Sequence, residues 1–297
     1  DCRGCGDSPR TPHVLRSILR SMAPQPTADS LLGLAREMAH SAGEILLDGR
    51  PDAPRAAVVS TSTKTSPTDI VTERDVASEK AIVAAIESRR PDDAILGEEG
   101  TNRSGTSGFT WIIDPLDGTI NYLYGSPQWA VSIAVADSDG PLVGVVYAPA
   151  VGVEYWAIRG QGAFREDAAG VVQLPPIEDV ELGHALFATG FGYRTERRVQ
   201  QANVMASVLP KIRDIRRKGS AALDLCMVAA GMVNGYFERG AHPWDYAAGA
   251  LIATETGAVV SGLHGKPAGV DMVVAAPPQV HAGITALLES LNADEGD

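Results

Sequence analysis

The chain has 297 residues, of which 44% are hydrophobic and 21% are charged, so it can bury a substantial core as one large domain or two small ones. Its formal net charge of −12 argues against nucleic-acid binding, because a phosphate backbone is neutralised by clustered Lys and Arg. Its apolar runs are shorter than the ~20 residues that span a bilayer, and its three cysteines are too few for a disulfide framework. We therefore expect a soluble, cytoplasmic protein without a membrane partner.

The first 27 residues are predicted to be a disordered N-terminal extension. Up to the first methionine, Met22, they show no regular apolar periodicity. The remainder, residues 28–297, contains neither an internal repeat nor a Pro-rich linker, so we expect it to fold as a single unit.

Helical and strand patterns alternate along this unit. Thr27 is a candidate N-cap for a first helix, and Gly49 is its expected stop. The expected elements of the first half are helices at 31–46 and 75–89 and strands at 94–96, 110–113, 129–136, 142–147 and 154–158. The expected elements of the second half are helices at 220–233, 245–256 and 279–291 and strands at 235–238, 259–260 and 272–275. A hairpin in the middle followed by α/β alternation predicts an α/β fold of layered sheets and helices.

The most informative segment is the one that carries Asp114 and Asp117. An apolar strand leads to Asp114, Pro115 is expected to end the strand ladder, and residues 117–119 read as a turn that opens a helix. Two carboxylates on such a turn suit Mg²⁺, which prefers carboxylate and water oxygens. The amides of Gly118 and Thr119 would meet an anion. The alternative for this segment alone is a capped structural turn.

Two more acidic sites favour the metal interpretation. Glu98 and Glu99 follow a strand-like run, and Asp245 precedes a helix of small residues. Taken singly, the first pair could be a solvated loop and Asp245 a helix N-cap. Carboxylates that each lie at the end of a strand or the start of a helix are better explained together by a metal site.

The basic residues gather between Arg194 and Lys218, against the overall charge. A solvated helix face or a subunit contact explains this segment most simply, and an anionic partner is the alternative. Cys226 lies in an apolar helical run and is expected to pack as a small hydrophobe. The six histidines are scattered, and His242 alone is expected near Asp245, with a packing role.

Residues 27–291 resemble the inositol monophosphatase family. The motifs that carry the resemblance, in the family's order and spacing, are GEE at 97–99, WIIDPLDGTIN at 111–121, KGSAALDLC at 218–226 and PWDYAAG at 243–249. The resemblance implies a layered αβαβα sandwich with a metal-binding N-terminal half to about residue 166 and an α/β C-terminal half after it. It also implies two Mg²⁺ ions, a third weaker one, sensitivity to lithium, and a homodimer.

The resemblance further implies residue roles. Glu98, Asp114 and the Leu116 carbonyl would bind the first magnesium, and Asp114, Asp117 and Asp245 the second. Asp75 matches an outer acid that can hold the third ion, and Lys64 begins a segment that matches a mobile lid. Glu98 or Thr119 would position the attacking water. The implied substrate contacts are Glu98, Leu116, Asp117, Gly118, Thr119, Gly219, Ser220, Ala221, Glu238 and Asp245, with Gly118 and Thr119 on the phosphate and Gly219 to Ala221 and Glu238 on sugar-like hydroxyls.

The predicted activity is Mg²⁺-dependent hydrolysis of inositol 1-phosphate, a small phosphate monoester, by activated water. The open alternatives within the family are phosphatases of histidinol phosphate, fructose 1,6-bisphosphate or nucleotide 3′-phosphates. A different kind of role is also open, because some members of the family act as binding partners in transcription complexes. Such a role would use the basic residues of 213–218.

Overall fold

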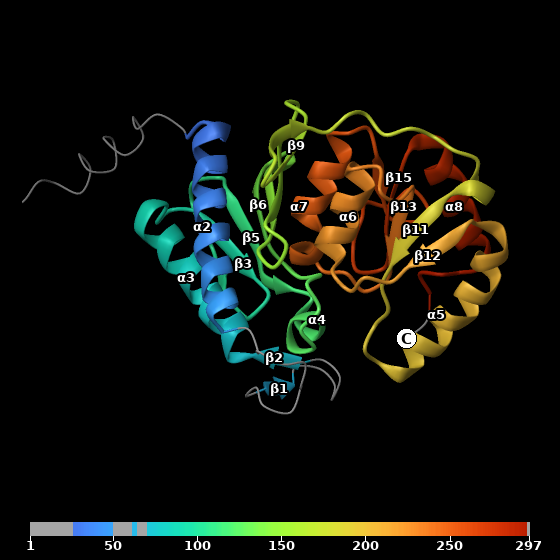
Figure 1. The fold of residues 1–297 in the computed structure, drawn as a ribbon, viewed down its shortest axis with the longest axis horizontal. Coiled ribbons are helices and arrows are strands. Elements are labelled where there is room, and N and C mark those ends of the chain that lie inside the picture. The colour runs from blue at the N-terminus through green and yellow to red at the C-terminus, as the bar shows by residue number, and fades with distance from the viewer. Residues whose placement is uncertain (1–25, 50–60, 64–69, 296–297) are drawn as a thin grey trace, which may run out of the picture.

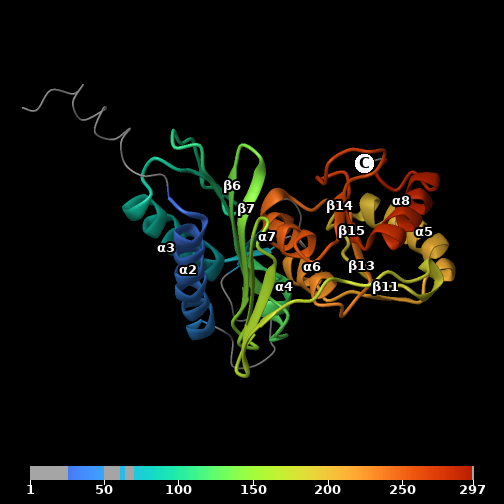
Figure 2. The ribbon, with the colours of Figure 1, turned by 90° about the horizontal axis from the view of Figure 1, so that it is seen from above.

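The computed structural model describes residues 26–49, 61–63 and 70–295. They form five layers, in the order helices, large sheet, helices, smaller sheet, helices (Figures 1 and 2). This is the αβαβα sandwich that the family resemblance implies, and it agrees with the layered α/β fold expected from the residue patterns. The predictions for residues 1–25 and for Lys64 lie outside the described residues.

The first layer is a pair of helices, α2 (Ala28–Asp48) and α3 (Glu73–Arg89). As predicted, Thr27 caps α2, with its hydroxyl oxygen accepting from the amide of Ser30 at 3.2 Å. The apolar face of α2 packs with buried side chains of the large sheet, including Trp111 and Val145. Helix α3 follows a two-stranded sheet of β1 (Thr61–Thr63) and β2 (Ile70–Thr72).

The large sheet has the strand order β10-β9-β8-β7-β6-β5-β3-β4. Its strands are β3 (Ala94–Gly97), β4 (Asn102–Arg103), β5 (Thr110–Asp117), β6 (Ala130–Asp137), β7 (Gly140–Ala148), β8 (Val153–Ile158), β9 (Ala163–Asp167) and β10 (Gly170–Gln173). Strands β3 and β5 are parallel, whereas β5 and β6 are antiparallel. The carboxyl ends of β3 and β5 therefore meet at one edge of the sheet.

The expectation that Pro115 ends the ladder is wrong. Strand β5 continues to Asp117, which pairs with Ala130 after a register shift that begins at Asp114. Proline has no amide hydrogen to donate to a neighbouring strand. Pro115 lies inside the register shift, where it has no ladder partner on β6, so the strand can continue past it. The irregularity lies between Asp114 and Asp117, which both keep partners on β6.

Helices α6 (Ala221–Ala229) and α7 (Pro243–Thr254) form the middle layer. Small residues let them approach closely, since a Cβ added at Gly249 would lie 2.7 Å from Cβ of Leu225. Cys226 is fully buried, as expected. Helix α6 is shorter than the sequence suggests, because the chain leaves the helix at Ala230 and Gly231 adopts a left-handed φ of 64°.

The smaller sheet has the order β12-β11-β13-β15-β14 and is covered on its outer face by two helices. The strands are β11 (Leu186–Thr189), β12 (Asp214–Arg216), β13 (Gly235–Glu238), β14 (Val259–Ser261) and β15 (Val273–Ala276), the outer helices α5 (Thr195–Val208) and α8 (Pro278–Ser290), and the 3₁₀ turns Leu182–His184 and Leu209–Lys211. No helix in the described part of the chain is long and apolar enough to cross a membrane.

Candidate active site

A cleft of about 540 Å³ contains the metal and substrate residues that the sequence predicts. It lies where the end of β5 faces the starts of α6 and α7 and the end of β13. The predicted residues that line it are Glu98, Asp114, Leu116, Asp117, Gly118, Thr119, Gly219, Ser220, Ala221, Glu238 and Asp245. Asp75 lies behind this lining and contacts it through Thr119.

The parallel pair β3–β5 brings Glu98 beside Asp114. Glu98 directly follows β3, and its amide donates to the carbonyl of Ile113 at 3.1 Å. Asp114 comes next on β5, with its Oδ1 accepting from the amide of Leu116 at 3.0 Å. Because both strands end at the same edge of the sheet, carboxylates distant in sequence are adjacent in the cleft.

Ser132 connects Asp114 with the start of α7. It lies opposite Asp114 in the β5–β6 register, and its hydroxyl donates to the carbonyl of Trp244 at 3.3 Å. Asp245 is the next residue, and its Oδ2 accepts from the amide of His242 at 2.6 Å. The N-cap of α7 is His242, not Asp245, which the sequence left open as an N-cap; Asp245 is instead the third residue of the helix and completes a capping box. His242 lines the cleft and stacks on Trp244, with ring centroids 4.9 Å apart.

Asp117 is held at the N-terminus of α6. Its Oδ2 accepts from the Ser220 hydroxyl at 2.5 Å and from the amide of Ala222 at 2.8 Å. A carboxylate at this position is favoured by the exposed amides and the helix dipole. The two halves of the chain are therefore joined at a predicted metal ligand.

The acidic residues of the cleft are crowded and buried. Burial raises the pKa of Asp114 well above its usual range, and the charge of Glu98 raises it further. Burial likewise raises the pKa of Asp117 to about 7, against the hydrogen bonds from Ser220 and Ala222. The pKa of Asp245 is raised by burial and then by Glu98. Such a set of carboxylates is stabilised by a bound cation.

The chemistry of this donor set fits a hard divalent cation. Carboxylate oxygens and the Leu116 carbonyl are the ligand types that Mg²⁺ prefers. Among the described residues, no group of three or more His, Cys, Asp or Glu side chains is arranged so that it could hold a metal ion by itself. Mg²⁺ commonly keeps several waters and also binds substrate phosphate, so it does not require a protein-only cage.

Thr119 and Asp75 form a hydrogen-bonded pair beside the carboxylates. Thr119 begins the short helix α4 (Thr119–Leu123), and its hydroxyl lies 3.0 Å from Oδ1 of Asp75 and 3.2 Å from the carbonyl of Leu116. The amide of Thr72 donates to the other Asp75 oxygen at 2.9 Å. Burial raises the pKa of Asp75 although these hydrogen bonds favour its charged form.

Gly118 needs to be glycine. Its φ is 94°, and an added Cβ would lie 2.9 Å from the carbonyl of Gln128 and 3.1 Å from that of Gly219. A side chain here would push the strand end away from the loop before α6. The turn that presents the Gly118 and Thr119 amides therefore depends on this residue.

Two residues of α3 support the site and were missed from the sequence. Ser78 donates to the carbonyl of Pro115 at 3.1 Å, which anchors the irregular end of β5. Glu79 is buried and accepts from the amides of Glu99 at 2.8 Å and Thr101 at 3.1 Å. The available signal was their spacing after Asp75, which places all three residues on one side of a helix.

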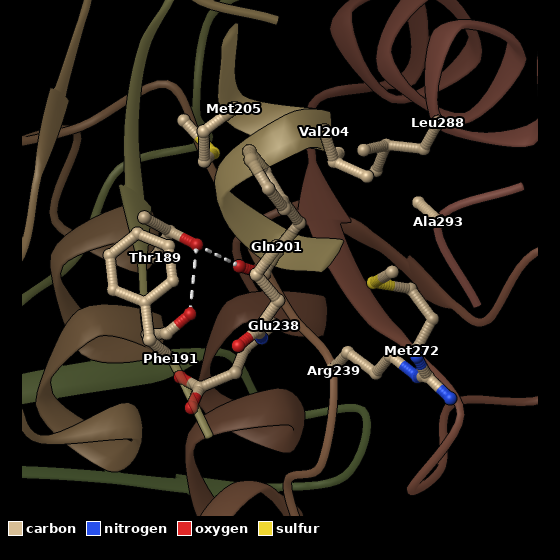
Figure 3. A pocket seen from close by; sticks show the side chains of 12 residues that line it. Thr189, Phe191, Gln201, Val204, Met205, Glu238, Arg239, Met272, Leu288 and Ala293 are labelled. Carbon is tan, nitrogen blue, oxygen red and sulfur yellow. Dashed lines mark hydrogen bonds between the residues drawn. The ribbon is translucent and has the colours of Figure 1, made fainter. Parts of the chain in front are cut away.

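Glu238 ends β13 and faces the cleft from the smaller sheet. Its Oε2 accepts from the Tyr236 hydroxyl at 3.0 Å, as expected for residues two apart on one strand face. Glu238 also borders a recess of about 20 Å³, the room of one water molecule. Figure 3 shows the recess, with Thr189, Phe191 and Glu238 near one another and Val204, Leu288 and Met272 on its far side.

The remaining lining comes from residues that sequence reasoning did not assign. The loop after β11 contributes residues 190–194, and Arg197 and Arg217 also line the cleft. This loop lacks a periodic pattern and follows a strand that the sequence did not reveal. Asp224, on α6, also lines the cleft. The sequence feature that could have identified Asp224 is a carboxylate inside an otherwise apolar helix.

The fold and the cleft agree with comparisons to known proteins. A family model described as "Inositol monophosphatase family" matches residues 27–293. The inositol-1-monophosphatase of Mycobacterium leprae (strain TN) is 42% identical over 236 residues, 77% of this chain and 81% of that protein. The Nus factor SuhB of Pasteurella multocida (strain Pm70) is 37% identical over 271 residues, 89% of this chain and 98% of that protein. The solved structure of Mycobacterium tuberculosis SuhB is 40% identical in sequence and matches with a TM-score of 0.74. The match covers 90% of this chain and 99% of that one.

The layered fold, the acidic cleft and these matches define a phosphoric monoester hydrolase. The chain belongs to the inositol monophosphatase family, whose members are metal-dependent phosphatases. The predicted family, fold class and enzyme class are thereby confirmed.

Proposed function

We propose that this protein hydrolyses phosphate monoesters of small polyols, inositol 1-phosphate in particular, with Mg²⁺ as its cofactor. One observation carries the proposal. Carboxylates just after β3, on β5 and in the first turn of α7 line a single cleft beside Gly118 and Thr119, where a phosphate can meet both backbone amides and bound cations. The M. leprae relative, named an inositol-1-monophosphatase, supports the choice of substrate.

The residues that would hold two ions are those that the family resemblance implies. Glu98, Asp114 and the Leu116 carbonyl would hold one ion, and Asp114, Asp117 and Asp245 the other, with Asp75 near a weaker third position. Bound divalent ions supply charge neutralisation and a more acidic water for an in-line displacement. The crowding of raised-pKa carboxylates supports this assignment.

The side chains themselves move the proton and hold the substrate. The Thr119 hydroxyl can take a hydrogen bond from the attacking water while it donates to Asp75, 3.0 Å away. Glu98 is the second candidate for orienting that water. The amides of Gly118 and Thr119 would bind the phosphate oxygens. Residues 219–221 and Glu238 would contact the alcohol that leaves.

A substrate panel tests the proposal. Purified protein would be assayed with inositol 1-phosphate, histidinol phosphate, fructose 1,6-bisphosphate and a nucleotide 3′-phosphate, with Mg²⁺ or with EDTA. We expect Mg²⁺-dependent hydrolysis with the highest kcat/KM for inositol 1-phosphate. Hydrolysis that persists in EDTA would contradict the metal dependence, and a preference for another substrate would contradict the inositol assignment.

A second candidate role is that of a protein partner in transcription complexes. The relative from P. multocida carries the name Nus factor. Exposed basic residues lie along the edge strand β12: Arg216 ends the strand, and Arg213 and Lys218 lie before and after it. Metal-ligand variants that lose hydrolysis but keep a cellular phenotype would favour this role. Inhibition by lithium, a homodimer and a cytoplasmic location remain predictions from the family resemblance.

A further inference from the structure

Asp224 is a buried carboxylate for which the proposed mechanism has no use. It lies in the first turn of α6, is 1% exposed, and lines the same cleft as the predicted metal ligands. Its Oδ1 atom has no hydrogen-bond partner among the described residues. Burying an acceptor without a partner is costly, so a donor supplied from the cleft would relieve that cost.

A purely structural role explains Asp224 poorly. The start of α6 is already capped, because Asp117 accepts from the amide of Ala222 and Ser220 accepts from that of Leu223. An acidic residue in a first turn gains from the helix dipole, but this gain is smaller than the cost of an unpaired buried acceptor. The position therefore favours a ligand group as the missing partner.

Asp224 has a second carboxylate close by. Burial raises the pKa of Asp224 well above its usual range, and the next cause is the negative charge of Glu238. The Tyr236 hydroxyl fixes the orientation of Glu238, which faces the cleft from β13. A helix and a strand thus place an excess of hydrogen-bond acceptors on one side of the cleft. A group bound there must donate.

Arg217 indicates what kind of donor fits. Its charge lowers the pKa of both Asp224 and Glu238, so it lies within electrostatic reach of each carboxylate. A second cation between the carboxylates would be repelled by this guanidinium, whereas neutral hydroxyls would not. Neighbouring hydroxyl groups are therefore the better match.

We propose that Asp224 is a specificity-determining residue which, together with Glu238, binds two neighbouring hydroxyls of the alcohol that leaves. The substrate class is then a polyol phosphate with vicinal hydroxyls close to the ester. This inference rests on the proposed function and deepens it, because it adds to the same cleft a residue outside the metal and phosphate positions.

The test compares two substrates in Asp224→Asn, a nearly isosteric change that turns one acceptor oxygen into a donor. Loss of the acceptor oxygen leaves a bound hydroxyl unpaired and should lower kcat/KM for inositol 1-phosphate by about 5- to 150-fold. For p-nitrophenyl phosphate, which lacks hydroxyls, the fall should stay within about threefold. The double variant with Glu238→Gln should lose less than the product of the two single losses, since both residues bind one alcohol.

Asp139→Asn, in the exposed turn between β6 and β7, is the matched control and should keep the wild-type ratio of the two kcat/KM values. An equal fall on both substrates in Asp224→Asn, or an unchanged ratio, would overturn the inference. So would independent, multiplicative losses in the double variant. If the wild type hydrolyses monoesters with Mg²⁺ but Asp224→Asn leaves the ratio of the two kcat/KM values unchanged, the inference fails and the proposed function stands. If the wild type does not hydrolyse monoesters with Mg²⁺, both the inference and the proposed function fail.

Discussion

The hydroxyl of Ser220 donates a hydrogen bond of 2.5 Å to Oδ2 of Asp117. Ser220 also accepts from the amide of Leu223 at 3.3 Å, so one side chain caps α6 and holds a carboxylate from the end of β5. The helix start and the strand end come from opposite halves of the chain. The position of Asp117 therefore depends on how the two sheets are packed around the middle helices.

Ser220→Ala should reduce both stability and activity. Loss of an N-cap costs about 1 kcal/mol, which lowers Tm by roughly 2–4 °C in a chain of this size. We expect kcat/KM to fall about tenfold as well, because Asp117 loses its hydroxyl donor, keeps only backbone amide donors, and is held less firmly at the ion position. Ser138→Ala, in the exposed turn before β7, is the control. Thermal melting and kinetics that match the wild type would refute the dual role.

Asp114→Asn should abolish most activity and leave the fold intact. Asp114 is expected to contact both ions, so kcat should fall more than tenfold, equivalent to ~1.4 kcal/mol of barrier. In EDTA the variant should melt at or above the wild-type temperature, since a buried and repelled carboxylate is removed. A smaller fall in kcat with unchanged circular dichroism would disprove the two-ion assignment.

The metal-free protein should lose stability as pH rises. Folding raises the pKa of Asp117 to about 7 from an ordinary value near 3.9. Between these values the folded state binds more protons than the unfolded state, so the free energy of unfolding falls with increasing pH. The raised pKa values of Asp114 and Asp245 act in the same direction.

Melting curves in EDTA from pH 5 to pH 8 measure this effect. We expect Tm to fall across the range in EDTA and to fall much less in Mg²⁺, because bound cations stabilise the ionised carboxylates. Asp117→Asn should flatten the slope in EDTA. A Tm in EDTA that rises towards pH 8 would show that the carboxylates are stabilised without metal.

Glu238→Gln should change substrate preference more than catalysis. The charged acceptor is lost while the metal ligands and the Gly118 turn are untouched, so kcat/KM for inositol 1-phosphate should fall about 10- to 150-fold. Hydrolysis of p-nitrophenyl phosphate should change little. If kcat/KM falls equally for both substrates, Glu238 supports the structure of the site and does not bind substrate hydroxyls. The inositol assignment then loses the main residue that supports it.

Glu79→Gln should weaken metal binding. The two carboxylate oxygens of Glu79 accept from the amides of Glu99 and Thr101, which follow Glu98. Gln has only one acceptor oxygen, and its NH₂ group would face one of these amides, which is also a donor. The loop that carries Glu98 then loosens, so half-maximal activity should require several-fold more Mg²⁺ at a similar kcat. Glu87→Gln, on the exposed face of α3, is the control. An unchanged Mg²⁺ titration would show that Glu79 does not position Glu98.

The sequence alone determined the family, and it identified most of the carboxylates that line the candidate site. Strand and helix ends at Glu98, Asp114, Asp117 and Asp245 could be read because local patterns place carboxylates at such ends. Helices α2 and α3 were predictable because their apolar periodicity and caps are local features. The extension of β5 past Pro115 was not, since a register shift depends on the partner strand.

Only the tertiary structure decided how distant residues meet. Glu79 reaches the loop after Glu98, and Ser132 reaches the start of α7, through packing that no local pattern encodes. Strands β11 and β12 were missed; they pair in parallel with each other, and β11 pairs in parallel with β13, so that segments distant in sequence meet in one sheet. Asp224 could be seen in the sequence, but its unpaired oxygen and its nearness to Glu238 exist only where α6 packs against β13. Burial and the electrostatic field of neighbours, which set the chemistry of a carboxylate, are properties of the folded chain.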